Sequence, residues 1–376
     1  MNKTLKNYRQ DLHRIPELGY EVYKTKAYIT GILKQYDCEI TEVCGTGICA
    51  YFHAKDPKKE IKNETIAFRS DMDGLPVREM TNKPYQSLHE GCMHACGHDG
   101  HMAMLLALAG EINQRLQTLS KNVLLIFQPA EETIGGAKDI CDTEILKKYS
   151  VRKIYGFHLW PMLEKNAVGS RPNEFMAKSS EIDIEINGRS AHIACAEQRI
   201  DALAIGCRYV NDLYAMVKNE LPEKEYRLLG FGRMTSGTAR NVVSASTLLQ
   251  GTLRCFHPDT FNFIISRMDE IAKSYEKVYS CTISISHTTG FPPVINDPKL
   301  FLEAKESLKE FNFHTLERPF MISEDFSFYQ QEIPGLFLFL GTGTNIPLHS
   351  DNFDFDEDVL NTGLKVYLTL LGMVTV

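Results

Sequence analysis

The chain has 376 residues and a net charge of −7, with 41 Lys and Arg residues against 48 Asp and Glu residues. This length predicts two domains with room for a hydrophobic core, and the acidic balance argues against a nucleic-acid partner. The first ten residues lack the apolar segment of a signal peptide, and no apolar run approaches the roughly 18 residues of a membrane helix, so we expect a cytoplasmic protein without membrane contact.

Residues 1–176 show alternating strand and helix patterns. A helical start is followed by a strand at 65–70, which ends just before Asp71 and Asp73, and by a largely apolar helix at 99–116. Further strands are predicted at 123–127 and 154–159. These strands are continuous apolar runs, which is typical of strands covered on both faces of an α/β sheet.

The pattern changes near residue 177, where Ile182, Ile184 and Ile186 alternate with polar residues, as in a sheet with one solvated face. A helix at 200–217, strands at 227–234 and 246–256, a helix at 260–279 and a strand at 282–287 follow. This β-α-β-β-α-β order predicts a ferredoxin-like α+β domain at 177–290, inserted into the first domain. Residues 291–376, with a helix at 298–311 and a strand at 336–340, would complete the first domain.

Five side chains of metal-binding types lie in four separate segments: Cys96, His98, Glu132, His158 and His349. Three of the segments follow or close predicted strands. Open α/β sheets place chemistry at the carboxyl ends of their strands, so these side chains can converge there. Thiolate, imidazole and carboxylate ligands suit zinc, manganese, cobalt or nickel.

Each of these residues also has an ordinary explanation when it is considered alone. A Cys-x-His pair can be a buried thiol beside a surface histidine, and His158 can be a hydrogen-bonded core residue. His349 can be a solvated loop residue, and Glu131–Glu132 can mark a helix N-terminus. If Glu132 binds a metal, however, Glu131 can act as general base on a metal-bound water, whose pKa falls to about 7.

Several ordered motifs resemble the amidohydrolase branch of the aminoacylase and carboxypeptidase-type metallopeptidases. The resemblance covers nearly the whole chain and rests on residues 11–19, 71–76, 93–99, 127–132, 188–192, 251–254, 323–326 and 348–349. It implies an α/β protein of two domains, in which a zinc-peptidase-like mixed-sheet catalytic domain carries the inserted domain as a lid or dimerisation domain. A homodimer or higher homo-oligomer formed through that domain is therefore expected.

The resemblance also implies the roles of individual residues. Two divalent metal ions per subunit would be bridged by Cys96, with His98, Glu132, His158 and His349 as the other ligands and Glu131 as base. Asp73 would orient a ligand, although a turn-forming aspartate is the alternative.

The inserted domain supplies three more candidates by the same resemblance. His192 would stabilise the oxyanion, in its own or a neighbouring subunit, while Asn241 and Arg254 would bind substrate. A strand-end hydrogen bond or a surface ion pair is the alternative for Asn241 and Arg254. The chain departs from the family pattern on both sides of His192: Ser190–Ala191 replace a glycine pair, and Ala196–Glu197 replace a proline and a second histidine.

The expected function is metal-dependent hydrolysis of the amide bond of N-acyl amino acids, which releases a carboxylic acid and an amino acid through Glu131-assisted attack of a metal-bound water. N-acetyl-diaminopimelate, hippurate and conjugated auxins are alternative substrates that the motifs do not separate. A non-catalytic metal-binding protein would have no need of Glu131. A thiol redox protein would be expected to show CxxC pairs, and the ten cysteines form none.

Overall fold

The computed structural model describes residues 4–56, 64–133, 135–195, 197 and 199–373. The chain divides into two compact units. The large unit comprises Met1–Phe175, Val294–Pro319 and Asp325–Val376, and the inserted unit comprises Met176–Pro293 and Phe320–Glu324. The short segment Phe320–Glu324 is an addition to the inserted unit that the sequence pattern does not indicate.

A mixed eight-stranded sheet forms the centre of the large unit, in the order β1-β2-β4-β3-β5-β14-β6-β13. Neighbours among β4, β3, β5 and β14 run parallel, and β2 and β6 flank them in antiparallel orientation. The carboxyl ends of the four parallel strands therefore share one edge. The strands are β1 (Glu39–Val43), β2 (Gly47–Phe52), β3 (Thr65–Asp71), β4 (Asn122–Gln128), β5 (Val151–Trp160), β6 (Val168–Ser170), β13 (Phe313–Thr315) and β14 (Gly335–Gly341). A separate two-stranded sheet pairs β7 (Asn173–Met176) with β12 (Val294–Asn296).

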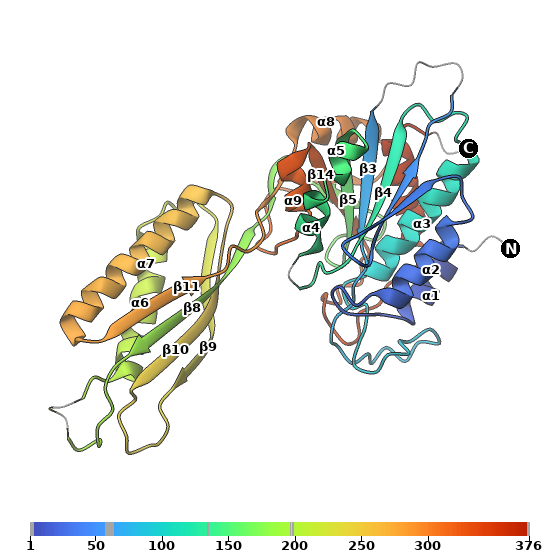
Figure 1. Ribbon diagram of the computed structural model, residues 1–376. Coiled ribbons are helices and arrows are strands. Elements are labelled where there is room, and N and C mark those ends of the chain that lie inside the picture. Colours follow the sequence, from blue (N-terminus) through green and yellow to red (C-terminus); the bar gives the residue numbers. More distant parts are fainter. Residues whose placement is uncertain (1–3, 57–63, 134, 196, 198, 374–376) are drawn as a thin grey trace. The chain divides into compact units, whose positions relative to one another are not determined.

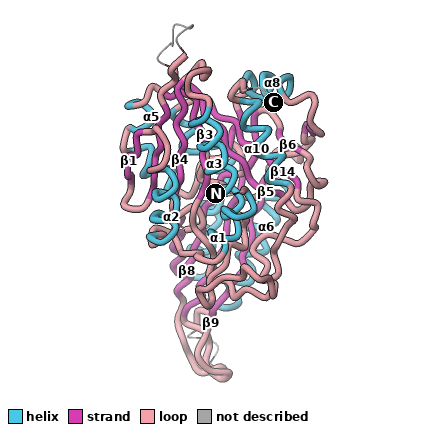
Figure 2. Tube along the Cα trace, turned by 90° about the vertical axis from the view of Figure 1, so that its right-hand side faces the viewer, coloured by secondary structure: helices cyan, strands magenta, loops and turns pink. Residues whose placement is uncertain are grey.

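Helices cover both faces of this sheet, which explains why its central strands are continuous apolar runs. One hydrophobic cluster joins the sheet to α1 (Leu5–His13), α2 (Tyr23–Leu33), α3 (His98–Gln114), α8 (Pro298–Ser307) and α10 (Val359–Leu370). The other face carries α4 (Gly136–Asp142), α5 (Ile145–Lys148) and α9 (Ser327–Glu332) (Figure 1). Figure 2 views the large unit from the side of α1, α2 and α3. The predicted buried helix is α3, in which 12 of 17 residues are buried.

The inserted unit has a four-stranded antiparallel sheet in the order β11-β8-β10-β9. Along the chain its elements are β8 (Lys178–Asn187), α6 (Ala202–Asn219), β9 (Arg227–Ser236), β10 (Ser246–Cys255), α7 (Pro258–Tyr279) and β11 (Thr282–His287). Ile182, Ile184 and Ile186 are buried, whereas Asp183 and Glu185 between them are exposed. The predicted β-α-β-β-α-β order is thus confirmed.

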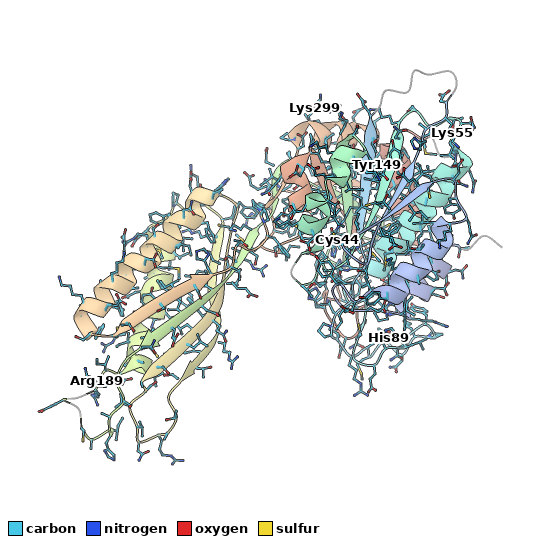
Figure 3. The ribbon with its side chains drawn as sticks, in the orientation of Figure 1. Cys44, Lys55, His89, Tyr149, Arg189 and Lys299 are labelled. Atoms are coloured by element: carbon cyan, nitrogen blue, oxygen red, sulfur yellow. The ribbon has the colours of Figure 1, made fainter. Side chains whose placement is uncertain are left out.

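The carboxyl edge of the parallel strands is covered by long connections. One of them runs from the end of β3 to the start of α3 and includes His89, and Lys299 at the start of α8 lies toward the opposite end of the large unit (Figure 3). Among the described residues, no helix is both long and apolar enough to cross a bilayer.

Candidate metal centre

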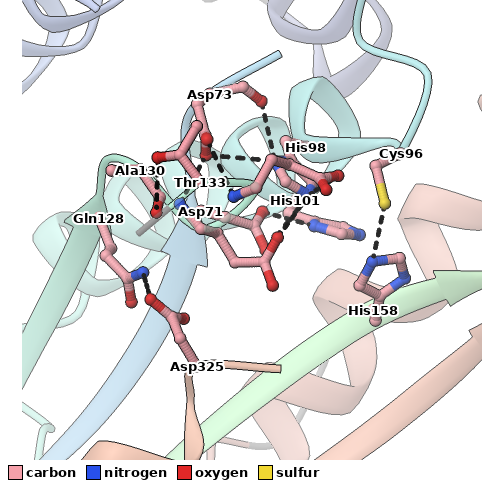
Figure 4. Close-up of polar contacts among 12 residues, drawn as sticks. Asp71, Asp73, Cys96, His98, His101, Gln128, Ala130, Thr133, His158 and Asp325 are labelled. Carbon is pink, nitrogen blue, oxygen red and sulfur yellow. Dashed lines mark hydrogen bonds and ion pairs between the residues drawn. The ribbon is translucent and has the colours of Figure 1, made fainter. Parts of the chain in front are cut away.

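The predicted metal ligands converge at the carboxyl edge of the large sheet. The ligand atoms of Cys96, His98 and His158 lie within 4.8 Å of one another, and so do those of Cys96, Glu132 and His349. The two groups share Cys96. Figure 4 shows Cys96 facing His158, with His98 beside them.

Cys96 and His98 lie where the long connection between β3 and α3 ends and α3 begins. Gly97 has φ 89° and is the N-cap of α3, and a Cβ atom at this position would lie 3.0 Å from Leu159 Cδ1. His98 Nδ1 donates a hydrogen bond to the Asp73 carbonyl oxygen over 2.8 Å, while His98 Nε2 is buried without a hydrogen-bond partner. Burial lowers the pKa of His98, but Asp71, Asp73 and Glu132 outweigh it and raise that pKa to about 10.

Glu131 and Glu132 follow a left-handed residue, Ala130, whose φ is 62°. The Asp73 carboxylate accepts hydrogen bonds from the backbone N–H groups of Glu131 and Glu132, each over 3.1 Å. Glu132 Oε1 lies 3.8 Å from His98 Nε2, and Glu131 Oε2 lies 3.9 Å from it. Asp73 therefore contacts His98 through its carbonyl and the glutamate pair through its carboxylate, whose pKa is raised by burial.

His158 lies near the end of β5, and His349 lies in the loop that follows β14. His158 Nδ1 donates to the Leu159 carbonyl oxygen over 2.7 Å, so that His158 Nε2 faces Cys96 Sγ at 3.3 Å. Burial and the neighbouring His101 lower the pKa of His158 to about 3, which keeps its imidazole neutral. His349 has φ 65°, donates its backbone N–H to Ala95 over 2.8 Å, and places Nε2 3.2 Å from Glu132 Oε1.

These residues fit a pair of divalent metal ions. His98 Nε2 is a buried ligand atom without a hydrogen-bond partner among the described residues, and Glu132 Oε1 is a buried ligand atom that lies 3.2 Å from His349 Nε2. Burial and the carboxylates of Glu132 and Glu131 hold the pKa of the Cys96 thiol well above its usual value, so a cation is needed to make the thiolate the stable form. His98 and His158 also donate their Nδ1 protons to carbonyl oxygens, as metal-binding imidazoles usually do.

The other predicted site residues lie in the inserted unit. His192 forms a β-bridge with Val242, and the Ile193 N–H group donates to the Asn241 carbonyl oxygen over 3.1 Å, so His192 and Asn241 are on adjacent segments. His192 is exposed, and its Nδ1 accepts a hydrogen bond from the Ala194 N–H group over 3.2 Å. Ala196, one of the departures from the family pattern, lies outside the described residues.

Arg254 lies at the opposite end of the same sheet. It is eight residues after Ser246, the first residue of β10, which corresponds to about 26 Å at about 3.3 Å per residue. Its Nη1 donates to the Met321 carbonyl oxygen over 2.7 Å, and burial lowers its pKa. The inserted unit therefore does not bring Arg254 next to His192 and Asn241.

A buried polar network supports the metal centre, and it includes residues to which the sequence patterns assign no role. Arg69 donates to Gln128 over 2.9 Å, to Asp71 over 2.8 Å and to Asp325 over 2.7 Å. Gln128 in turn donates to Asp325 over 2.7 Å, as Figure 4 shows. Burial alone would raise the pKa of Asp71, but His98, His101 and Arg69 hold it well below its usual range. An arginine inside the fully buried strand β3 is the sequence signal of this network.

Comparison with known proteins gives concordant matches over nearly the whole chain. Residues 67–372 match the model of peptidase family M20/M25/M40. The N-acetyldiaminopimelate deacetylase of Oceanobacillus iheyensis is 32% identical over 375 residues, covering 99% of both chains, and that of Brevibacillus brevis is 31% identical over 373 residues, covering 97% of both. The structure of the Bacillus subtilis YXEP protein, a dinuclear metal-binding peptidase of family M20, matches with a TM-score of 0.84 and 29% identity, over 98% of this chain and 96% of that chain.

Proposed function

Because the chain belongs to peptidase family M20/M25/M40 and is a metal-dependent amidohydrolase of that family, we propose that it hydrolyses the amide bond of N-acyl amino acids. The products would be a carboxylic acid and a free amino acid. The observation that carries this proposal is the convergence of five metal-binding side chains around Cys96 with the buried Glu131 beside them.

The proposed chemistry divides between the metal ions and Glu131. Two divalent ions, held by Cys96 together with His98, Glu132, His158 and His349, would polarise the scissile carbonyl and lower the pKa of the attacking water. Glu131 accepts one proton from that water as its oxygen bonds to the carbonyl carbon. Glu131 then donates this proton to the amide nitrogen as the C–N bond breaks, so it returns to its starting state. Asp73 holds the backbone of Glu131 by accepting a hydrogen bond from its N–H group.

Arg254 is proposed to bind the carboxylate of the amino-acid part. Its hydrogen bond to the Met321 carbonyl fixes the guanidinium through Nη1, and the remainder of the fork would make the bidentate contact. Its half-buried position strengthens such a charge-assisted contact relative to one in open solvent.

His192 and Asn241 are proposed to act in the site of a second copy of the chain. About 26 Å along β10 separates Arg254 from the end of the sheet near these residues, and an N-acetyl amino acid is far shorter. Arg254 and His192 of one copy of the inserted unit therefore cannot contact the same substrate molecule. A homodimer through this unit is consistent with β9, an edge strand that exposes Leu228 and Met234.

A complementation experiment tests the use of two copies. His192→Ala and Glu131→Gln homodimers should each be nearly inactive. Mixed dimers should regain activity, because the site with an intact Glu131 receives His192 from its partner. If mixed dimers stay as inactive as the two parents, His192 serves its own chain, and this part of the proposal is wrong.

N-acetyl-diaminopimelate is a second, narrower candidate substrate, favoured by two relatives named N-acetyldiaminopimelate deacetylase. The test is amine release from a panel of N-acyl amino acids that includes this compound, with chelator-stripped protein and with Mn²⁺ or Zn²⁺ restored. Metal-dependent turnover that is lost in Glu131→Gln supports the proposal, and unchanged turnover in that variant contradicts it. The cytoplasmic location expected from the sequence stays a prediction.

A further inference from the structure

Leu159 connects two parts of the metal centre through its backbone. Pairing between β3 and β5 ends at Arg69 and Gly156, whereas β5 continues to Trp160. The Leu159 N–H group instead donates to His101 Nε2 over 2.9 Å, and the Leu159 carbonyl accepts from His158 Nδ1 over 2.7 Å. The peptide groups on both sides of Leu159 thus contact a histidine side chain.

His101 is fully buried on α3, three residues after His98, and both of its ring nitrogens are engaged. Because Nε2 accepts the Leu159 N–H group, the ring proton must be on Nδ1, which lies 2.7 Å from Asp71 Oδ1. Asp71 is itself held by Arg69 over 2.8 Å. His101 therefore has no lone pair left for a metal, although its ring lies 4.8 Å from that of His158.

The Leu159 side chain brings the first turn of α3 against β5. A Cβ atom on Gly100 would lie 2.8 Å from Leu159 Cδ1, closer than real Cβ contacts. Gly97 has a similar contact, at 3.0 Å. The absence of side chains at these glycines lets α3, which carries His98, lie directly on the strand that carries His158.

We propose that His101 is a positioning residue that fixes His158 in the orientation required for metal binding. It accepts the backbone N–H group of Leu159, whose carbonyl in turn accepts the Nδ1 proton of His158. Asp71 and Arg69 anchor His101 from behind. This inference rests on the proposed metal centre and adds to it a residue that contacts neither metal nor substrate.

Two substitutions separate the contacts of His101. The Oε1 atom of glutamine lies two bonds beyond Cγ, as does His Nε2, so His101→Gln keeps an acceptor for Leu159. The Nδ2 atom of asparagine lies one bond beyond Cγ, as does His Nδ1, so His101→Asn keeps only the donor to Asp71. The readout is the number and affinity of Zn²⁺ ions bound by the full chain, measured by competition with a chromophoric chelator.

We expect His101→Asn to lower the affinity for one of the two Zn²⁺ ions by about 10–100-fold, which is the usual effect of removing a hydrogen-bond partner of a metal ligand. His101→Gln should retain most of the parent affinity. Equal weakening in both variants, or no weakening in either, would overturn the proposal. Asn122→Ala is the matched control, because it removes one buried hydrogen bond, to the Ala54 N–H group, at the amino end of β4, and it should keep both ions.

Two further proteins keep the outcomes distinguishable. If the parent binds no pair of Zn²⁺ ions, or if His158→Ala loses neither ion, the proposed metal centre is wrong and this inference falls with it. If the His101 variants do not fold, Gly100→Ala provides the test with His101 intact, since its methyl group would lie 2.8 Å from Leu159 Cδ1, 2.9 Å from Phe355 Cζ and 3.2 Å from Leu360 Cδ2, and would force α3 away from β5. Gly100→Ala should lower the affinity for the same one of the two Zn²⁺ ions, and an unchanged Zn²⁺ affinity would overturn the inference.

Discussion

His13 at the end of α1 provides a quantitative test of the buried charges behind the metal centre. Its Nδ1 lies 2.7 Å from Asp99 Oδ2 and its Nε2 lies 3.3 Å from Glu79 Oε1, so both ring nitrogens face carboxylates. Arg9 donates to the same Asp99 oxygen over 2.9 Å. Burial lowers the pKa of His13, but the carboxylates outweigh it and raise that pKa to about 9 from 6.5.

The raised pKa fixes the sign of the pH dependence. The folded state binds the His13 proton more tightly than the unfolded state does. The contribution of protonated His13 to the free energy of unfolding is therefore fully present below pH 6.5 and is lost as the pH rises through about 9. The displacement from 6.5 to about 9 corresponds to about 3 kcal/mol. His13→Gln removes this titration, and at pH 6 it should lower the free energy of unfolding by about 3–5 kcal/mol, because Asp99 loses a buried partner.

Denaturant unfolding of parent and His13→Gln proteins between pH 6 and 9.5, followed by fluorescence, measures this effect. Trp160 is the single tryptophan of the chain and lies in β5, stacked on Phe339, so it reports on the large unit. A chelator is kept in excess because metal binding also depends on pH. The stability difference between the proteins should shrink by about 3 kcal/mol as the pH rises. A difference that stays constant over this range would refute the reasoning.

Three further substitutions test other parts of the structure. Asp325→Asn should lower the free energy of unfolding by about 3–5 kcal/mol in denaturant titrations, because it removes a buried charge that pairs with Arg69; a cost below 1 kcal/mol would contradict this. Gly136→Ala should lower Tm, because its Cβ would lie 2.0 Å from the Pro129 carbonyl oxygen, and a parent-like Tm would show that the backbone relaxes freely. Arg254→Gln should reduce kcat/KM about 10–100-fold through KM, and a loss confined to kcat would exclude a carboxylate-binding role.

The parts of the fold that the sequence predicts are those with a strong local pattern. The parallel strands are apolar runs because helices cover both faces, and the inserted unit shows alternation because one face of its sheet is solvated. The three-residue strands β6 and β13 lack such a signal, because β6 forms by pairing with β14 on one side and with β13 on the other, and these partners are distant in sequence. The edge strand β1 is largely exposed and carries two glutamates, so it has no apolar pattern either.

In the candidate site, too, the sequence identifies residues by their type but does not show the contacts that depend on the tertiary structure. Cysteine, histidine and glutamate each have an ordinary explanation alone, and it is their occurrence together in ordered motifs that identifies them as candidate ligands. The role of His101 depends on a backbone N–H group 58 positions away, and that of Asp325 on an arginine 256 positions away. Such hydrogen bonds leave no trace in the local sequence, apart from the charged residue Arg69, which follows the apolar residues 66–68 of the buried strand β3.

The backbone of the metal centre is held by the protein itself. Ala130, Gly97 and His349 all have positive φ, and each lies at or beside a proposed ligand or the proposed base. Residues in such conformations persist only where the surrounding structure fixes them. Asp73 fixes the peptide groups at Glu131 and Glu132, and Ala95 fixes that of His349. The donor atoms are therefore directed at one point by hydrogen bonds within the chain, so a metal pair would relieve charge repulsion among side chains already in place instead of ordering the loops that carry them.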